Sequence, residues 1–231
     1  MITKLRHAPT ESVHLVLMLA LTFATGIIDA VGYLGLDRVF SGNMTGNVVI
    51  LGMALLGADG LPVLGPLVAL AGFVAGAAGG GRVLKGADGG WTQRVTGLFA
   101  VTALVEWVVG VGLLTGLRAD ERPVQVGVVA VVGAAMGVQA ATARFLAVKD
   151  VPTVVVTSTL TGLASESVLG SGAGGGTVRR VAAVVLILVG AAAGAALLRW
   201  DIGAGFIAAG VVTGVVTVTG ARASRPDRRQ T

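Results

Sequence analysis

Long apolar runs alternate with short polar linkers along almost the whole chain. A helix needs about 20 apolar residues to cross the hydrocarbon core of a membrane. Six runs reach that length, at residues 13–36, 64–84, 95–117, 124–148, 181–198 and 202–220. Two others, at about 44–58 and 153–164, are too short. The pattern predicts an all-α integral membrane protein with six transmembrane helices and two short re-entrant or broken half-helices.

The order of the runs divides the chain into two halves. Each half reads long, short, long, long, and the polar linker at 118–123 separates them. We expect a single transmembrane domain over 13–220, with one repeat at 13–117 and a second at 124–220. Residues 1–12 are predicted to form a cytoplasmic N-terminal segment, and residues 221–231 a basic, disordered cytoplasmic tail.

Local similarity supports the repeat. The stretch around Gly76 aligns with the stretch around Gly190, and, separately, the stretch from Thr45 to Gly52 aligns with that from Thr157 to Ala164. Asp29 falls near Gln139 if a shift of two residues is allowed. Any two membrane segments rich in Gly, Ala and Val will align to some extent, so the shared order of long and short runs carries more of the argument.

The basic residues favour six crossings over eight. With six crossings and the N-terminus inside, 13 of the 17 Lys and Arg residues lie inside, whereas eight crossings leave only ten there. Cytoplasmic loops carry an excess of Lys and Arg. Six crossings place three spans in each half, so the repeats would be inverted, which is a common plan among secondary transporters. Both termini are then cytoplasmic.

Composition excludes several kinds of chemistry. The net charge is +5, but the basic residues lie at the ends of apolar runs, which indicates membrane topology and no nucleic-acid partner. The chain has no Cys and only two His, both near the N-terminus, so we expect no metal site and no cofactor. No hydrolase, metalloprotease or P-loop motif occurs, so we do not expect an enzyme. The 37 Gly residues predict close helix packing and leave self-association open.

Asp29 is the strongest candidate for a functional residue. It lies in the second half of the first span, where a carboxylate costs about 2.5–3.5 kcal/mol on insertion scales. It must therefore be neutral, paired or facing a polar cavity. One interpretation is a site that couples transport to a proton or cation. The other is a structural partner for Arg144 or for nearby Thr and Asn side chains.

A polar turn at the start of each short run supplies further candidates for substrate binding. They are Thr45, Gly46 and Asn47 in the first half and Thr157 and Thr159 in the second. Thr or Asn at this position can cap a helix. A helix that starts inside the membrane also presents N–H groups and a dipole that favour an anion. The alternative is plain capping at a water interface.

Three further candidate residues lie inside the long runs. Gln139 and Arg144 belong to the run at 124–148, and we include both among the substrate-binding candidates. Arg144 could bind an anionic substrate, or it could extend to the cytoplasmic edge of the membrane. Glu106 lies in the middle of the run at 95–117, where it could relay protons or bond to a hydroxyl or amide group.

Two spaced motifs resemble the YoaK family of bacterial multi-pass membrane proteins. The first comprises Gly26, Asp29, Ala30, Tyr33, Phe40, Thr45, Gly46, Asn47, Leu51 and Gly52. The second comprises Gly137, Gln139, Arg144 and the stretch from Val151 to Thr161. The resemblance covers about residues 15–220 and departs at Ser158, where the family tends to have Gly. It implies an integral protein of the bacterial inner (plasma) membrane and brings no assigned activity.

The sequence favours a small secondary transporter or permease. Its substrate would be a small polar solute or an ion, bound at the midplane between the two repeats, with Asp29 or Glu106 coupling transport to protons. The alternative is a non-transporting membrane scaffold or partner-binding protein, in which the polar residues only hold helices together.

Overall fold

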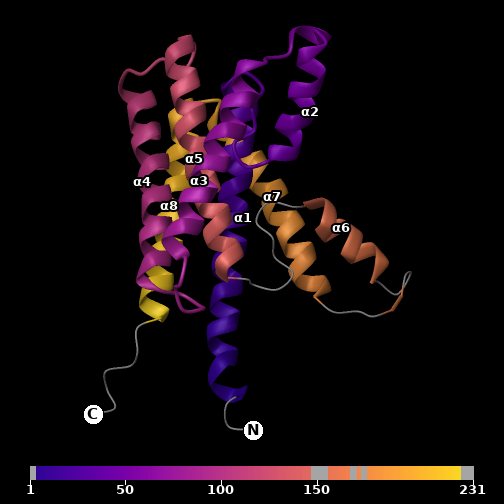
Figure 1. Ribbon diagram of the computed structural model, residues 1–231, viewed down its shortest axis with the longest axis vertical. Helices are drawn as coiled ribbons and strands as arrows, with labels where there is room; N and C mark the ends of the chain where they lie inside the picture. The colour runs from indigo at the N-terminus through magenta and orange to yellow at the C-terminus, as the bar shows by residue number, and fades with distance from the viewer. Residues whose placement is uncertain (1–3, 147–155, 167–170, 173–175, 225–231) are drawn as a thin grey trace.

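Eight α-helices and one short 3-10 helix make up the part of the chain that the computed structural model describes, residues 4–146, 156–166, 171–172 and 176–224. In chain order they are α1 (Lys4–Gly35), α2 (Met44–Leu55), η1 (Ala58–Gly60), α3 (Leu64–Leu84), α4 (Gln93–Thr115), α5 (Arg122–Leu146), α6 (Val156–Ser165), α7 (Thr177–Leu197) and α8 (Ile202–Ala223) (Figure 1). Among the described residues, six helices are long and apolar enough to cross a membrane, all except α2 and α6. The predicted all-α fold, with six long helices and two short ones, is confirmed.

Helix ends differ from the predicted ones where a cap or a polar segment decides them. Helix α4 begins at Gln93, two residues before the predicted start, because the Thr92 side chain accepts a hydrogen bond from the Val95 N–H (3.3 Å) and caps it. Helix α1 begins at Lys4, so it includes most of the predicted N-terminal segment. Helix α8 continues to Ala223, and residues 225–231 of the predicted tail lie outside the described residues.

The long helices cross the molecule in alternating directions. The start of α1, the end of α8 and the turn between α3 and α4 lie at one end of the bundle, at the bottom of Figure 1. The turns between α4 and α5 and between α7 and α8 lie at the other end. This is the six-crossing arrangement, since eight crossings would place the α3–α4 turn opposite the start of α1.

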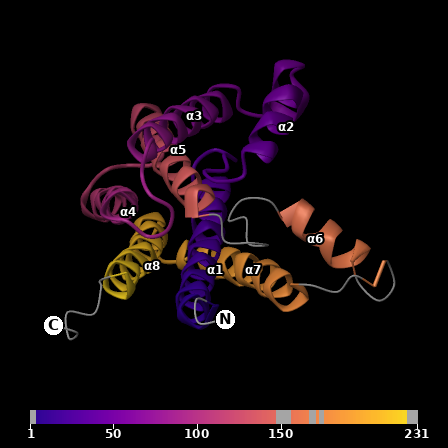
Figure 2. The same cartoon turned by 60° about the horizontal axis from the view of Figure 1, so that its bottom comes forward.

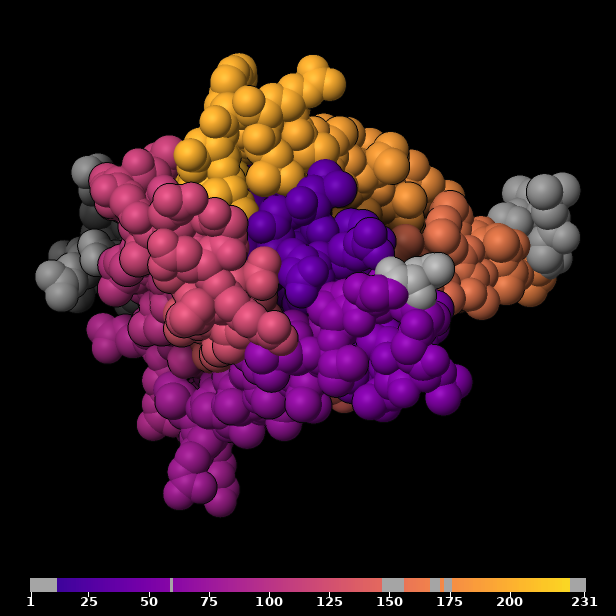
Figure 3. All heavy atoms as spheres, turned by 90° about the horizontal axis from the view of Figure 1, so that it is seen from above, coloured from indigo at the N-terminus to yellow at the C-terminus, as the bar shows by residue number. Residues whose placement is uncertain are grey.

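The two short helices lie at the margin of the bundle. Helix α2 lies in the upper half of Figure 1 and α6 in the lower half. Figure 2 shows α1 in the middle of the molecule, with α2 and α6 both outside the long helices on one side. Seen from above, α6 projects at the rim (Figure 3). An ion pair between Glu166, just past α6, and Arg180 of α7 (2.8 Å) holds it there.

Glycine allows the backbones of α1 and α7 to touch. A Cβ placed at Gly26 of α1 would overlap the carbonyl oxygen of Ile187. A Cβ at Gly190 of α7 would likewise overlap the carbonyl oxygen of Phe23. Small residues are the usual means of close helix approach in membranes.

Helices α5 and α3 meet in the same way. A Cβ at Gly137 of α5 would overlap the carbonyl oxygen of Phe73, and one at Gly76 of α3 would overlap that of Ala134. The contacts of Gly137 on α3 therefore match those of Gly26 on α7, and the contacts of Gly76 match those of Gly190.

In the remaining pair, α4 and α8, each helix places a glycine against the backbone of the other. A Cβ at Gly110 of α4 would lie 2.8 Å from the carbonyl oxygen of Gly203. A Cβ at Gly210 of α8 would lie 3.2 Å from the carbonyl oxygen of Ala103. The apolar core lies between these pairs, around the fully buried side chains of Ile28, Val132 and Phe206.

Candidate functional site

The segment between α1 and α2 folds back along α1. Asp37 and Arg38 both adopt left-handed backbone angles (φ 60° and 59°), and they reverse the chain just after α1 ends. The start of α2 consequently lies level with Asp29, six residues before the end of α1. At a rise of 1.5 Å per residue that is about 9 Å inside the helix end. Helix α2 therefore begins within the molecule and rises toward its upper end (Figure 1).

Asp29 holds the folded-back segment by its backbone. One carboxyl oxygen, Oδ1, accepts hydrogen bonds from the N–H groups of Ser41 (3.0 Å), Gly42 (2.6 Å) and Asn43 (3.3 Å). A Cβ at Gly42 would lie 3.0 Å from the Thr25 side chain and 3.4 Å from Oδ1, so glycine suits this close approach. The partners of Asp29 are therefore backbone groups. Arg144 is not among them.

Two asparagines organise the start of α2. Asn43 is the N-cap, and its side chain accepts a hydrogen bond from the Gly46 N–H (3.2 Å). Asn47 is fully buried and pairs with the backbone of Phe40: its Oδ1 accepts from the Phe40 N–H (2.9 Å), and its Nδ2 donates to the Phe40 carbonyl (2.6 Å). The cap is therefore Asn43, and neither Thr45 nor Asn47 caps the helix.

A pocket of about 490 Å³ opens beside the start of α2. Its polar lining comes from the first half through Thr25, Asp29, Asn43 and Thr45 and from the second half through Thr157. Its apolar lining comes from Val49, Ile50, Val156 and Ile187. Gly46, Tyr33 and Phe40 complete the lining. Four of the predicted binding residues, Asp29, Thr45, Gly46 and Thr157, therefore meet at one site.

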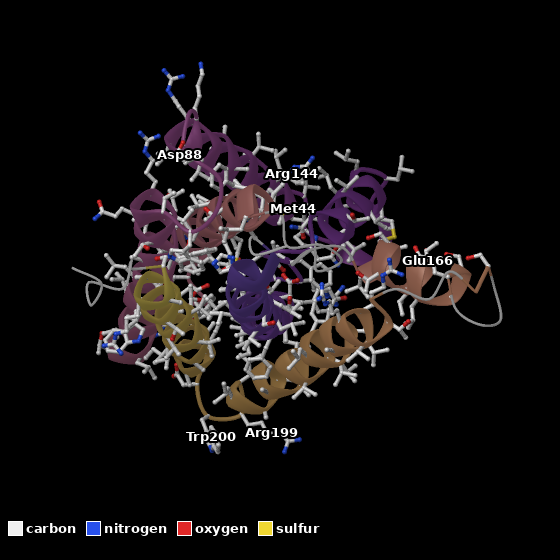
Figure 4. All side chains as sticks on the ribbon, turned by 90° about the horizontal axis from the view of Figure 1, so that it is seen from below. Met44, Asp88, Arg144, Glu166, Arg199 and Trp200 are labelled. Atoms are coloured by element: carbon white, nitrogen blue, oxygen red, sulfur yellow. The ribbon has the colours of Figure 1, made fainter. Side chains whose placement is uncertain are left out.

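The other predicted residues of the site lie elsewhere. Gln139 is buried behind the pocket wall, where its Nε2 donates to the Thr25 hydroxyl (3.2 Å) and its Oε1 has no hydrogen-bond partner in the described part of the chain. Thr159 is buried on α6 and does not line the pocket. Arg144 is exposed on the last turn of α5, at the lower end of the bundle (Figure 4).

Glu106 occupies a second polar position, away from the pocket. It lies on the face of α4 that packs against α8 and is fully buried. Neither of its carboxyl oxygens has a hydrogen-bond partner among the residues that the structure describes. Thr213 of α8 faces it, but outside hydrogen-bond geometry.

Comparison with known proteins identifies the family. The family described as "Protein of unknown function (DUF1275)" matches residues 17–219 of the chain. The chain belongs to this family. The DUF1275 chain is also 33% identical over 148 residues to the "UPF0700 transmembrane protein YoaK" of Bacillus subtilis (strain 168). That match covers 64% of this chain and 64% of the relative, so the chain spans less than two thirds of the relative's length. No solved structure matches the chain.

The match confirms the resemblance to the YoaK family and establishes a multi-pass membrane protein. In this DUF1275 protein, sequence reasoning missed Thr25 and Asn43, and it named Tyr33 and Phe40 as part of the family motif but not as candidates for the site. The rings of Tyr33 and Phe40 do stack (centroids 4.8 Å apart), but both also line the pocket. Thr25 had one signal, a hydroxyl in the middle of an apolar span one turn before Asp29. Among the described residues no group of three or more His, Cys, Asp or Glu side chains could hold a metal.

Proposed function

We propose that this protein is a small secondary transporter or permease for a small polar solute or ion. The observation that carries the proposal is the pocket beside α2, because its polar groups come from both halves of the chain, and two of them, Thr25 and Asp29, lie within the long helix α1. Sites of this kind, formed at the start of short helices between two repeats, recur among secondary transporters.

Matched helix packing supports the inverted-repeat part of the proposal. Helix α1 packs on α7 as α5 packs on α3, and α1 contacts α8 as α5 contacts α4. Helix α2 contacts α3 as α6 contacts α7. Helix α1 ascends in Figure 1 and α5 descends, so the proposed repeats have opposite orientations in the membrane. Relative motion of two such halves would open the pocket alternately to the two sides.

The proposed location is the bacterial inner membrane, with both termini in the cytoplasm. Proton coupling is assigned to the two acidic side chains within the candidate membrane spans, Asp29 and Glu106. Asp29 belongs to the pocket, whereas Glu106 lies between α4 and α8 and would act through the packing of that pair.

Reconstitution into liposomes tests the proposal with a broad panel of solutes. Stopped-flow light scattering reports the entry of any solute after an isosmotic gradient is applied, and a pH-sensitive dye trapped inside reports protons that move with it. We expect at least one small polar solute to enter faster than into empty liposomes. Thr45→Val and Thr157→Val, which remove pocket hydroxyls, should slow that entry.

Thr115→Val is the matched control. Thr115 is exposed at the end of α4, and its hydroxyl bonds only to the backbone of its own helix, so this variant should transport normally. If no solute in the panel enters faster than into empty liposomes, the transporter proposal is wrong. The scaffold interpretation would then account better for the polar residues.

A further inference from the structure

We propose that the pocket beside α2 binds the ammonium group of a small organic solute, with Asp29 as its counter-ion. The inference rests on the proposed function of this pocket as a binding site and adds the chemical class of the solute. It is carried by the geometry of Asp29, by the charge of the pocket lining and by the aromatic pair at its edge.

Asp29 presents one oxygen to the backbone and the other to the pocket. Oδ1 accepts the three N–H groups of residues 41–43. Oδ2 accepts no hydrogen bond within the described part of the chain, and the side chain lines the pocket. The three bonds fix the carboxyl group in place before any solute arrives, which is the preorganisation that a specific binding site requires.

The pocket lining carries no basic side chain among the residues that the structure describes. Arg144 is exposed at the end of α5, and Arg180 is paired with Glu166, so neither lines the pocket. An anionic solute would therefore meet the Asp29 carboxyl group without a basic residue to offset it, whereas an ammonium group would pair with it.

The N-termini of α2 and α6 also face the pocket, and their partial positive charges favour an anion over an ammonium group. A helix N-terminus is equivalent to about half a positive charge. The N–H groups just before α2 are already bonded to Asp29, so the start of α2 is largely neutralised. The start of α6 lies against the pocket through Val156 and Thr157. Asp29 is the one residue with a full charge in the described lining, so an ammonium group would pair with its carboxyl group, and a solute that also carries an acidic group would place that group near α6.

The aromatic pair and the hydroxyl groups define the rest of the solute. Tyr33 and Phe40 stack at the pocket edge, and aromatic rings attract organic cations. Thr45 and Thr157 are exposed toward the pocket and offer hydrogen bonds from opposite walls. A volume of about 490 Å³ is within the range of small-molecule sites. A small amine, a quaternary ammonium compound or an amino acid fits this description.

Thermal stabilisation of the purified protein in detergent tests binding separately from transport. The probes are ethylammonium, choline and alanine, each with an ammonium group, compared with glycerol and acetate. A ligand that binds the folded state raises the melting temperature in proportion to its affinity. We expect one or more ammonium compounds to stabilise the protein, and glycerol and acetate to leave it unchanged.

Variants assign the effect to the pocket. Asp29→Asn keeps an oxygen acceptor for the three N–H groups and removes the charge, so the Kd of the ammonium ligand should rise at least about tenfold. If Asp29→Asn does not fold, the aromatic pair gives an independent test: Tyr33→Leu should weaken binding about two- to fivefold, while Tyr33→Phe should not. Trp200→Leu, at an exposed aromatic residue remote from the pocket, is the matched control.

The outcomes separate this inference from the transporter proposal. Stabilisation by acetate or glycerol equal to that by the ammonium compounds, an unchanged Kd in a folded Asp29→Asn, or no stabilisation by any ammonium compound would overturn the inference. Flux of an anion through the wild-type protein would leave the transporter proposal standing and overturn this inference. Ammonium binding without flux of any solute would support this inference and overturn the transporter proposal.

Discussion

Polar side chains hold the segment between α1 and α2 by bonding to its backbone and not to one another. Asp29 takes three N–H groups, Asn47 takes both backbone groups of Phe40, and Asn43 caps α2. Away from water an unsatisfied backbone group costs several kcal/mol, so irregular backbone at membrane depth requires such partners. These bonds allow α2 to begin inside the molecule, and they position the polar groups of the pocket.

Asn47→Ala should destabilise the fold strongly. The change leaves the Phe40 N–H and carbonyl without partners in a buried site, and each such group costs about 1–3 kcal/mol. We expect the free energy of unfolding to fall by about 2–4 kcal/mol, measured by thermal unfolding in detergent. Thr45→Ala, two residues away and exposed, should leave the melting temperature nearly unchanged. Equal melting temperatures for the two variants would contradict this role of Asn47.

Sequence reasoning found the polar residues of this region but not their partners. Asp29, Thr45, Gly46 and Thr157 were predicted from their apolar surroundings, and the pocket brings them together. The partners of Asp29 could not be predicted, because any residue type carries a backbone N–H and the three donors depend on the turn at residues 37–38. Asn43 was missed as the cap for a related reason: the position of a cap depends on where the chain turns into the helix.

At the level of elements, glycine positions decide which helices can pack closely. Gly76 and Gly190 occupy matching places on α3 and α7, and each faces the backbone of the opposing helix. Gly79 belongs to the same run as Gly76 but has no atom within 4 Å of its Cβ position. Helix length and hydropathy predicted where these helices lie in the chain. Which glycines meet a partner depends on helix rotation, which composition alone does not specify.

Gly76→Ala and Gly190→Ala should therefore be damaging, and Gly79→Ala should not. Overpacking a tight contact costs about 1–3 kcal/mol, because the added methyl group forces the helix backbones apart. At Gly79 the methyl group meets no neighbour, and alanine favours the helix by up to about 1 kcal/mol. Melting temperatures of the three variants measure the difference. Unequal losses at Gly76 and Gly190 would count against the proposed repeat, and a loss at Gly79 would show that the effect is not one of packing.

For the whole molecule, the distribution of charge indicates the orientation in the membrane. The lower end of the bundle in Figure 1 carries Arg82, Lys85, Arg94, Arg144, Arg179, Arg180 and Arg222 on described helix ends and turns. The upper end carries Arg38, Arg118, Arg122 and Arg199. Because cytoplasmic ends are enriched in Lys and Arg, we propose that the lower end faces the cytoplasm.

Introduced cysteines test this orientation on an otherwise cysteine-free chain. Asp88 is exposed in the α3–α4 turn at the lower end, and Trp200 is 81% exposed in the α7–α8 turn at the upper end (Figure 4 labels both). In intact cells an impermeant thiol reagent should label Trp200→Cys at once and Asp88→Cys only after the cells are opened. The reverse labelling pattern would mean that the upper end faces the cytoplasm, and it would still agree with six crossings. Labelling of both sites in intact cells would contradict the six-crossing arrangement, and with it the inverted repeats on which the transporter proposal depends.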